Sequence, residues 1–407
     1  MSRFFPAKTR RSPFRPLATL IAIGAAIALN ACASSPVTLR GTADLATVIA
    51  RASGEVAILD TSNKQFTGII GGLGDLSHAS IVYARDGRFA FVFGRDGGLT
   101  KIDILSHKIV ARTLQAGNSI GGAISQDGKL VAVANYEPGG VRVFDTETLE
   151  LVADIPTTID RGPDRSKVIG LVDAPGNRFV FSLWDTGEIW IADFSAGNTP
   201  SVTRYQNIGI QPYDALITPD GRYYIAGLFG EDGMALLDLW HPQSGPQRIL
   251  DHYGKGEERL PVYKMPHLEG WAIAGKRAFV PAVGRHEVLV IDTETWQEVG
   301  RIPVHGQPVF VMAHPDGRHV WVNFSVPDYD TVQIIDTQTL AIDGELKPGT
   351  GVLHMEFSPR GDQVWLSVRD DNKVVGYDPY TLKPIAELPL PSPSGIFMSD
   401  RAGRIGL

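Results

Sequence analysis

Four side chains that can do chemistry recur at one position of a repeated sequence pattern. His78 and Lys167 each lie nine residues before a glycine, and Tyr213 and His267 each lie eight residues before one. An imidazole can ligate a metal or transfer a proton, an ammonium group pairs with anions, and a phenol donates a hydrogen bond. If the fold places these four residues on one ring, we expect a ligand-binding or catalytic site there.

A second set of candidate side chains lies in the loops that follow the next apolar segment of each repeat. It combines cations, acids and aromatic rings: Arg95, Tyr136, Glu137, Trp184, Asp185, Arg285, Arg369 and Asp370. Aromatic rings stack on flat molecules, and guanidinium or ammonium groups pair with carboxylates. The two sets together indicate a site for a flat ligand that carries several negative charges.

Both sets belong to a repeat with two markers. The turn glycines are 41 to 54 residues apart: Gly87, Gly128, Gly176, Gly221, Gly275, Gly317, Gly361 and Gly403. An aspartate that ends an apolar segment occurs in step with them: Asp60, Asp103, Asp145, Asp193, Asp238, Asp292, Asp336 and Asp378. A repeat of this length, built from short alternating apolar segments, is typical of a β-propeller.

The repeat therefore predicts an all-β chain that folds as an eight-bladed β-propeller. In such a fold the loops that carry both candidate sets surround one mouth of the central channel. The first aspartate marker precedes every turn glycine, and no aspartate marker follows the last glycine. We therefore expect residues 394–400 to pair beside residues 46–52, so that the N- and C-terminal strands close the ring without a free sheet edge.

The N-terminal segment has the pattern of an export signal with a lipidation site. Residues 1–16 contain five basic residues and no acid, and residues 17–29 form an apolar run too short to span a bilayer comfortably. Small residues then precede Cys32, as in a bacterial lipobox. We expect a periplasmic protein that Cys32 anchors to a membrane through lipid, and which membrane stays open. The predicted signal peptide, linker and single propeller domain are residues 1–31, 32–45 and 46–407.

Composition excludes several classes of function. A net charge of -7 argues against a general nucleic-acid binder. The single cysteine excludes an internal disulfide, a cysteine-rich zinc site, an iron–sulfur cluster and c-type haem attachment. The sequence has no nucleophile-elbow or phosphate-loop motif. His267 and Glu269 have no third ligand nearby in the sequence, so no independent metal site is predicted.

Several stretches of the chain resemble a known family. HASIVYARDGRFAFVFGRDGGLTKIDI looks like the stretch of cytochrome cd1 nitrite reductases that carries the proximal histidine of haem d1. VFVMAHPDGRHVWVNF and EFSPRGDQVWLSV look like later blades of the same d1 domain. The resemblance covers nearly all of the chain after the N-terminal segment, but a cytochrome c domain is missing. A d1-type propeller without that electron donor is similar to the NirF family of haem d1 biosynthesis.

The resemblance implies individual roles for four residues. His78 matches the proximal ligand of the haem iron, and His267 matches one of two distal histidines. Tyr213 stands in place of the other distal histidine, and Asp214 matches the aspartate that follows it. The resemblance thus implies that Tyr213, Asp214 and His267 position protons in any reaction on the ring.

The resemblance and the loop positions together define a set that would bind the tetrapyrrole. Lys167, with Arg165 nearby, falls where the reductase has an arginine near the macrocycle. The full set is His78, Arg95, Tyr136, Arg165, Lys167, Trp184, Arg285 and Arg369. The bound molecule would be haem d1 or a precursor of it. A structural reading stays open for each histidine, because a lone histidine at a strand start often only forms hydrogen bonds.

Three functions remain open at this point. The first is a periplasmic lipoprotein that binds a haem d1 precursor and takes part in its maturation, and a redox or side-chain step would make it an enzyme. The second is a non-catalytic carrier that hands the tetrapyrrole to nitrite reductase. The third is a propeller scaffold for protein–protein interactions. An enzyme and a carrier would share one pocket, so the sequence does not decide between them.

Overall fold

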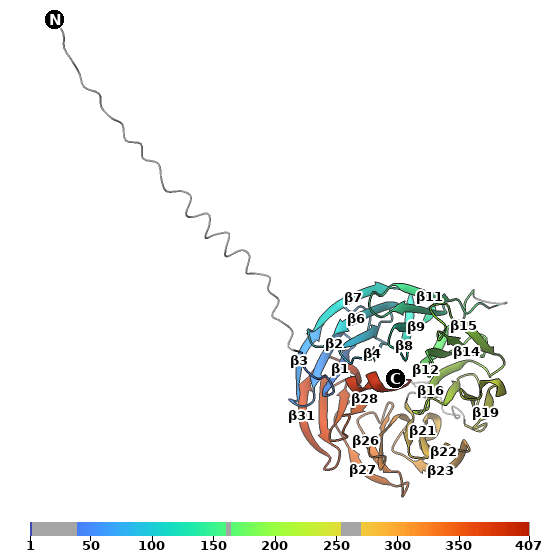
Figure 1. Ribbon diagram of the computed structural model, residues 1–407. Helices are drawn as coiled ribbons and strands as arrows, with labels where there is room; N and C mark the ends of the chain where they lie inside the picture. The colour runs from blue at the N-terminus through green and yellow to red at the C-terminus, as the bar shows by residue number, and fades with distance from the viewer. Residues whose placement is uncertain (2–38, 160–163, 254–269, 407) are drawn as a thin grey trace. The chain divides into compact units, whose positions relative to one another are not determined.

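The computed structural model describes Met1 and residues 39–159, 164–253 and 270–406. Within residues 41–406, short antiparallel strands form eight four-stranded sheets around a central axis, as Figure 1 shows. This arrangement confirms the predicted all-β, eight-bladed propeller. Over the described residues, no helix has both the length and the apolar character needed to cross a membrane.

One blade joins the two ends of the chain. Its strands are β1 (Leu45–Ala50), β2 (Glu55–Asp60), β3 (Gln65–Ile70) and β32 (Pro393–Met398). The next three blades are β4 (Ser80–Tyr83), β5 (Phe89–Phe93), β6 (Gly98–Asp103) and β7 (Lys108–Leu114); β8 (Asn118–Ile124), β9 (Leu130–Glu137), β10 (Val141–Asp145) and β11 (Leu151–Ile155); β12 (Val168–Ala174), β13 (Arg178–Leu183), β14 (Glu188–Asp193) and β15 (Ser201–Tyr205).

The remaining four blades follow in chain order. They are β16 (Pro212–Ile217), β17 (Tyr223–Leu228), β18 (Met234–Asp238) and β19 (Gln247–Ile249); β20 (Ala272–Ala274), β21 (Arg277–Ala282), β22 (Glu287–Asp292) and β23 (Gln297–Pro303); β24 (Pro308–Ala313), β25 (His319–Phe324), β26 (Val332–Asp336) and β27 (Ile342–Leu346); β28 (Val352–Phe357), β29 (Val364–Val368), β30 (Lys373–Asp378) and β31 (Lys383–Pro389). Short 3₁₀ helices are η1 (Pro242–Ser244), η3 (Val283–Arg285) and η4 (Ser399–Gly403).

The closing blade has the predicted pairing. Strand β32 is antiparallel to β1, with Ala46 opposite Met398 and Val48 opposite Ile396. These four side chains are fully buried in one apolar cluster between the first and last blades. Gly403 is the exception to the glycine ladder, because residues 399–403 form η4 instead of a hairpin turn.

The aspartate ladder has a local cause. Each marker aspartate is the last residue of the third strand of its blade, and its carboxylate accepts backbone N–H groups from the turn that follows. Asp336, for example, accepts hydrogen bonds from the amides of Gln338 and Thr339, both at 2.8 Å. The Thr339 hydrogen bond, together with the Arg318 guanidinium, lowers the pKa of Asp336 to about 2 even though burial opposes that shift.

The C-terminal segment lies across one end of the central channel. The Arg85 guanidinium donates to the carbonyl oxygens of Ala402 and Arg404, at 3.0 and 2.9 Å. Asp173 accepts the Gly406 amide at 2.8 Å, and Arg85 pairs with Asp173 at 2.8 Å. Figure 1 shows the C-terminus near the middle of the ring. The candidate site therefore lies toward the opposite mouth.

Candidate functional site

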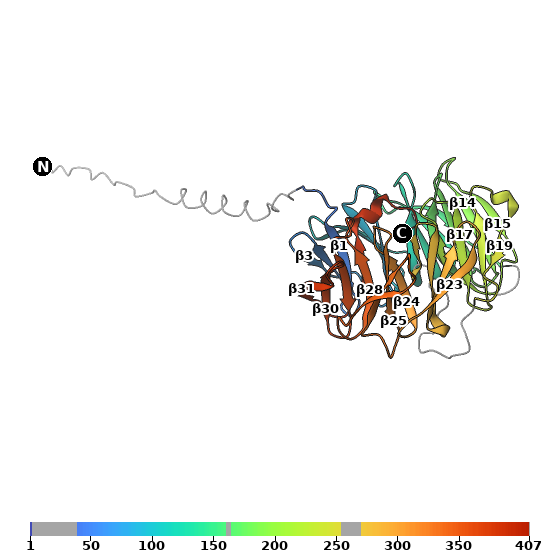
Figure 2. The same ribbon diagram turned by 90° about the horizontal axis from the view of Figure 1, so that it is seen from below.

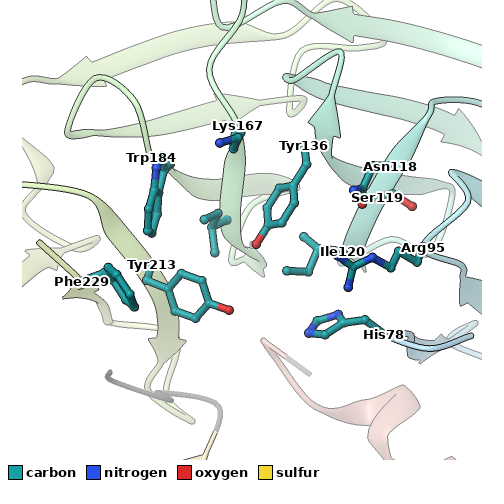
Figure 3. Close-up of a pocket in the computed structure, with 11 residues that line it drawn as sticks. His78, Arg95, Asn118, Ser119, Ile120, Tyr136, Lys167, Trp184, Tyr213 and Phe229 are labelled. Carbon is teal, nitrogen blue, oxygen red and sulfur yellow. The ribbon is translucent and has the colours of Figure 1, made fainter. Parts of the chain in front are cut away.

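A cavity of about 320 Å³ lies at the mouth of the channel that carries the predicted residues. Its lining comes from four consecutive blades: His78, Arg95, Asn118, Ser119, Ile120, Tyr136, Lys167, Ile169, Trp184, Tyr213 and Phe229 (Figure 3). Six of these are predicted site residues, namely His78, Arg95, Tyr136, Lys167, Trp184 and Tyr213. The repeat register thus brought residues 135 positions apart in the sequence into one cavity.

His78 is held by the short loop that precedes β4. Leu76 anchors this loop in the core, with 1% of its surface exposed. The Asp75 carboxylate accepts a hydrogen bond from the Ser77 amide at 2.8 Å. Its hydrogen bonds with the side chain and the backbone of Ser77 lower the pKa of Asp75. The Arg51 guanidinium donates to the carbonyl oxygen of Ser77. Three contacts therefore fix the backbone next to His78.

The two cations of the cavity differ from most arginines of the propeller. Arg95 and Lys167 are exposed and face the cavity, and neither forms an ion pair with the part of the chain that the structure describes. Their backbones are fixed, because the Arg95 amide donates to the Asp75 carbonyl at 2.8 Å and the Lys167 amide to the Asp185 carboxylate at 2.9 Å. An unpaired cation on a fixed backbone is suited to bind an anionic group.

Three aromatic rings form a cluster on the other side of the cavity. The Trp184 and Phe229 ring centroids are 5.3 Å apart, and each lies 5.9 Å from the Tyr213 centroid. The Phe229 amide donates to the Gln211 carbonyl at 2.8 Å, which holds Phe229 beside the start of β16. In Figure 3, Trp184 and Phe229 lie at one side, and His78 and Arg95 lie together at the other.

Tyr136 and Tyr213 connect the two sides of the cavity. Burial raises the pKa of Tyr136 to about 12, although a hydrogen bond with Tyr213 opposes that shift. Tyr136 is therefore protonated at neutral pH, and its hydroxyl can donate a hydrogen bond to a ligand.

A second cavity of about 310 Å³ adjoins the first and reaches down the channel toward Gly406. His78, Ile120, Ile169 and Tyr213 border both cavities. The lining of the second cavity also includes Asp214, Arg51, His354 and Arg401. The imidazole of His78 is thus placed where a ligand that extends through both cavities can meet it.

The floor of the second cavity is a buried polar group. His354 lies in β28, and its Nδ1 accepts the Ile396 amide at 3.3 Å. Burial lowers the pKa of His354 to about 4, so this ring is neutral at pH 7. Beside it, the Arg401 guanidinium forms two hydrogen bonds with the Glu356 carboxylate, at 2.9 and 2.7 Å. These contacts join β28 to β32 and to η4 below the cavity.

Three predicted cations do not line either cavity. Arg165 pairs with Asp154 at 2.7 Å, Arg369 pairs with Asp370 at 2.6 Å, and Arg285 donates to the His252 carbonyl at 3.2 Å. The partner of Arg165 lies in β11, that of Arg369 is the next residue of its own loop, and that of Arg285 lies in the loop after β19. The structure therefore separates them from Arg95 and Lys167. His267 and Cys32 lie outside the described residues.

The cavity also contains residues that the sequence analysis did not select. Phe229 follows β17 as Trp184 follows β13, so the repeat register alone could have placed it at the mouth. Asn118 lies at the start of β8, next to a ring position, and was missed for lack of charge. Arg51 follows β1, and no pattern around it indicates that it reaches the loop of His78.

An eight-bladed propeller with a histidine, two cations and aromatic rings at one mouth agrees with comparisons to known proteins. The chain belongs to the family described as "Cytochrome D1 heme domain", which it matches over residues 40–402. It is 61% identical to Protein NirF of Stutzerimonas stutzeri and 63% identical to Protein NirF of Pseudomonas aeruginosa. Each alignment covers 97% of this chain and 99% or more of the relative.

A solved structure shows the same architecture. The dihydro-heme d1 dehydrogenase NirN, in complex with DHE, superposes with a TM-score of 0.78 at 27% sequence identity. The match covers 91% of this chain and 78% of that protein. The NirF-like assignment from the sequence is confirmed by these relatives.

Proposed function

We propose that this protein binds a d1-type tetrapyrrole at the mouth cavity and takes part in haem d1 biosynthesis. The observation that carries the proposal is the position of His78, which borders both cavities, with Arg95 near it and Lys167 across the cavity. Neither cation has an ion-pair partner among the described residues. Membership of the d1 family and the similarity to NirF and NirN support the same ligand class.

The residues present suit a flat, iron-containing, acidic ring. His78 would hold the iron of the ring, because imidazoles are common ligands of haem iron. Arg95 and Lys167 would bind carboxylates of the ring, and Trp184 would supply an aromatic surface for it. Tyr136, which stays protonated at neutral pH, would offer its hydroxyl as a hydrogen-bond donor to the ring.

A bound tetrapyrrole supplies iron and a conjugated ring that can gain or lose electrons. The chain supplies the environment of that ring. Asp214 lines the second cavity and is 8% exposed, and Tyr213 borders both cavities, so the two would hold a proton for a ring that extends through both cavities. This arrangement favours a role in maturation, with a carrier role as the alternative outcome.

The mature protein is proposed to act in the periplasm as a lipoprotein anchored through Cys32. The support is the order of a basic segment, a short apolar run and small residues before the only cysteine. Nitrite reductase is the expected recipient of the finished cofactor.

The decisive experiment is a titration of the purified protein with the ferric d1 ring extracted from a nitrite reductase. We expect saturable binding and a shifted Soret band, with the shift lost in His78→Ala and kept in His241→Ala, whose histidine is exposed on the rim of another blade. An identical spectrum for wild type and His78→Ala means that another group ligates the iron. Incubation with a reduced precursor of the ring, followed by mass spectrometry, separates an enzyme from a carrier.

A further inference from the structure

The loop that carries Arg95 has a counterpart in the blade of β28 to β31. Arg95 and Arg369 both follow the second strand of their blade, and the amide of each donates a hydrogen bond of 2.8 Å to a carbonyl in the loop before that blade. An aspartate comes next in both loops, Asp96 and Asp370. Asp370 forms an ion pair with Arg369 at 2.6 Å. An aspartate at this place can therefore bind the guanidinium of the residue before it.

Asp96 binds a different arginine. Its carboxylate pairs at 2.8 Å with Arg112 of β7, whose guanidinium also donates to the Thr100 hydroxyl at 3.2 Å and to the Leu73 carbonyl at 3.3 Å. The lack of a side chain at Gly98 leaves room for this pair, because a Cβ there would lie 2.8 Å from Nη2 of the arginine and 2.9 Å from Oδ1 of the aspartate. The ion pair therefore occupies the acid that stands next to the cation of the cavity.

The register of the outer strand explains why the two loops differ. Arg112 lies opposite Thr100, three residues before the marker aspartate of its blade. Glu387 has the same register position in the other blade, opposite Val375. Both residues belong to strands at the outer edge of their blades, as Figure 1 shows for β7 and Figure 2 for β31. A glutamate repels a carboxylate and cannot bind Asp370, so that aspartate pairs within its own loop.

A third blade repeats the arrangement around an arginine. Arg248 in β19 has the same register position as Arg112. It pairs at 3.0 Å with Glu231, which lies in the loop after the second strand, and it donates to the carbonyl of Ile208 at 3.4 Å. Ile208 lies in the loop before β16, as Leu73 lies in the loop before β4. In two blades, an arginine of the outer strand thus binds both an acid at the mouth and the loop before the blade.

We propose that Arg112 is a positioning residue for the ligand site, which keeps the Arg95 guanidinium available to an acidic group of the ring by binding Asp96. The proposal rests on the proposed function and adds a residue that lines neither cavity. A second acid near Arg95 is Asp75, whose carboxylate accepts a hydrogen bond from the Ser77 amide at 2.8 Å within its own loop. Without Arg112, Asp96 binds Arg95 as the corresponding aspartate does in the blade of β28 to β31, and a ligand has to displace it.

The first test needs no ligand. Phenylglyoxal modifies free guanidinium groups, and the rate at Arg95 can be followed by peptide mass spectrometry on the full protein. We expect Arg112→Gln to slow this rate about threefold, since an ion pair at the surface protects the group only modestly. The double variant Arg112→Gln with Asp96→Asn should return to the wild-type rate. A rate that Arg112→Gln leaves unchanged overturns the proposal.

The second test is a titration with the extracted ferric d1 ring. Arg112→Gln should lower the affinity about three- to fivefold without moving the Soret band, because the competing pair is partly exposed. Adding Asp96→Asn should restore the affinity, since asparagine keeps an oxygen for the Gly98 amide that Asp96 accepts at 3.0 Å. Arg222→Gln is the matched control: it removes an ion pair of 2.9 Å with Asp238, outside both cavities, and should bind as wild type.

The outcomes separate this proposal from the proposed function. A loss of affinity that Asp96→Asn does not restore, or an altered Soret band, overturns the proposal, because Arg112 then acts through the Leu73 carbonyl in the loop of His78. If wild type and Arg112→Gln bind the ring equally well, only this proposal fails. If wild type does not bind the ring, the proposed function fails, and the labelling rates alone decide whether Arg112 frees Arg95.

Discussion

Replacement of Ile396 by alanine tests whether closure of the ring carries the stability of the propeller. Ile396 lies in β32 opposite Val48 and is fully buried in the cluster between the first and last blades. The change removes three carbon atoms, and at about 0.8 kcal/mol for each the transfer cost is about 2.4 kcal/mol. A cavity that only partly collapses adds to this cost, so we expect a loss of about 3–4 kcal/mol.

The assay is reversible urea unfolding followed by tryptophan fluorescence, with Ile342→Ala as the matched control. Ile342 lies in β27 and is 41% exposed, so its truncation should cost less than about 1 kcal/mol. The midpoint should fall clearly for Ile396→Ala and little for the control. Equal losses in the two variants would refute the reasoning, because the joint between the chain ends would then contribute no more than an outer strand.

Three further predictions concern the ligand, acid stability and localisation. Lys167→Ala should weaken binding of the extracted d1 ring about two- to tenfold without changing its spectrum, because an exposed cation contributes a modest binding energy. Salt screens this energy, so the loss of affinity should be smaller in high salt. An altered Soret band would instead implicate Lys167 in the geometry of the iron. Asp336→Asn should destabilise the fold by about 2 kcal/mol at pH 7, since it weakens hydrogen bonds to a carboxylate whose pKa is lowered to about 2. A lowered pKa in the folded state gives stability that is present above the unfolded pKa near 4 and is lost as the pH falls toward 2. Urea unfolding at pH 3 should therefore show a smaller difference in stability between wild type and Asp336→Asn than at pH 7. A constant difference would contradict the role of the charge. Cys32→Ala should move the protein from the membrane fraction to the soluble fraction or leave an unprocessed precursor, whereas unchanged fractionation would rule out the lipid anchor.

The fold could be predicted because each marker aspartate forms its turn through contacts with residues two or three positions later in the chain. The carboxylate of Asp292 accepts hydrogen bonds from the amides of Glu294 and Thr295, at 3.0 and 2.8 Å. An aspartate at the end of the strand therefore favours this turn through local hydrogen bonds alone. Gly87 has a φ of 66°, a conformation that glycine adopts without strain. Since eight copies of a local rule repeat along the chain, their spacing predicts the number of blades. Gly403 departs from the rule because it lies in η4 and not in a hairpin turn.

The binding residues were only partly predictable, because position on the ring does not decide what a side chain pairs with. Arg95 and Arg369 both follow the second strand of a blade, and the sequence treats them alike. Arg369 has Asp370 beside it and forms an ion pair at 2.6 Å. Arg95 also has an acid beside it, but Asp96 pairs with Arg112 at 2.8 Å and leaves Arg95 to the cavity. The difference depends on Arg112, which belongs to the outer strand β7 and lies 16 residues after Asp96 in the sequence.

The position of His78 depends on both ends of the chain. The amide of Arg51 donates to the Ser392 carbonyl at 3.2 Å, next to the strand that closes the ring, and its guanidinium donates to the carbonyl of Ser77. Burial and the nearby Arg369 lower the pKa of Arg51, so this guanidinium is held against an electrostatic cost. The histidine loop is therefore fixed by the blade that joins residues 45–70 to residues 393–398. One arginine thus joins the closing blade to the loop of His78, and no pattern in the sequence around His78 contains that connection.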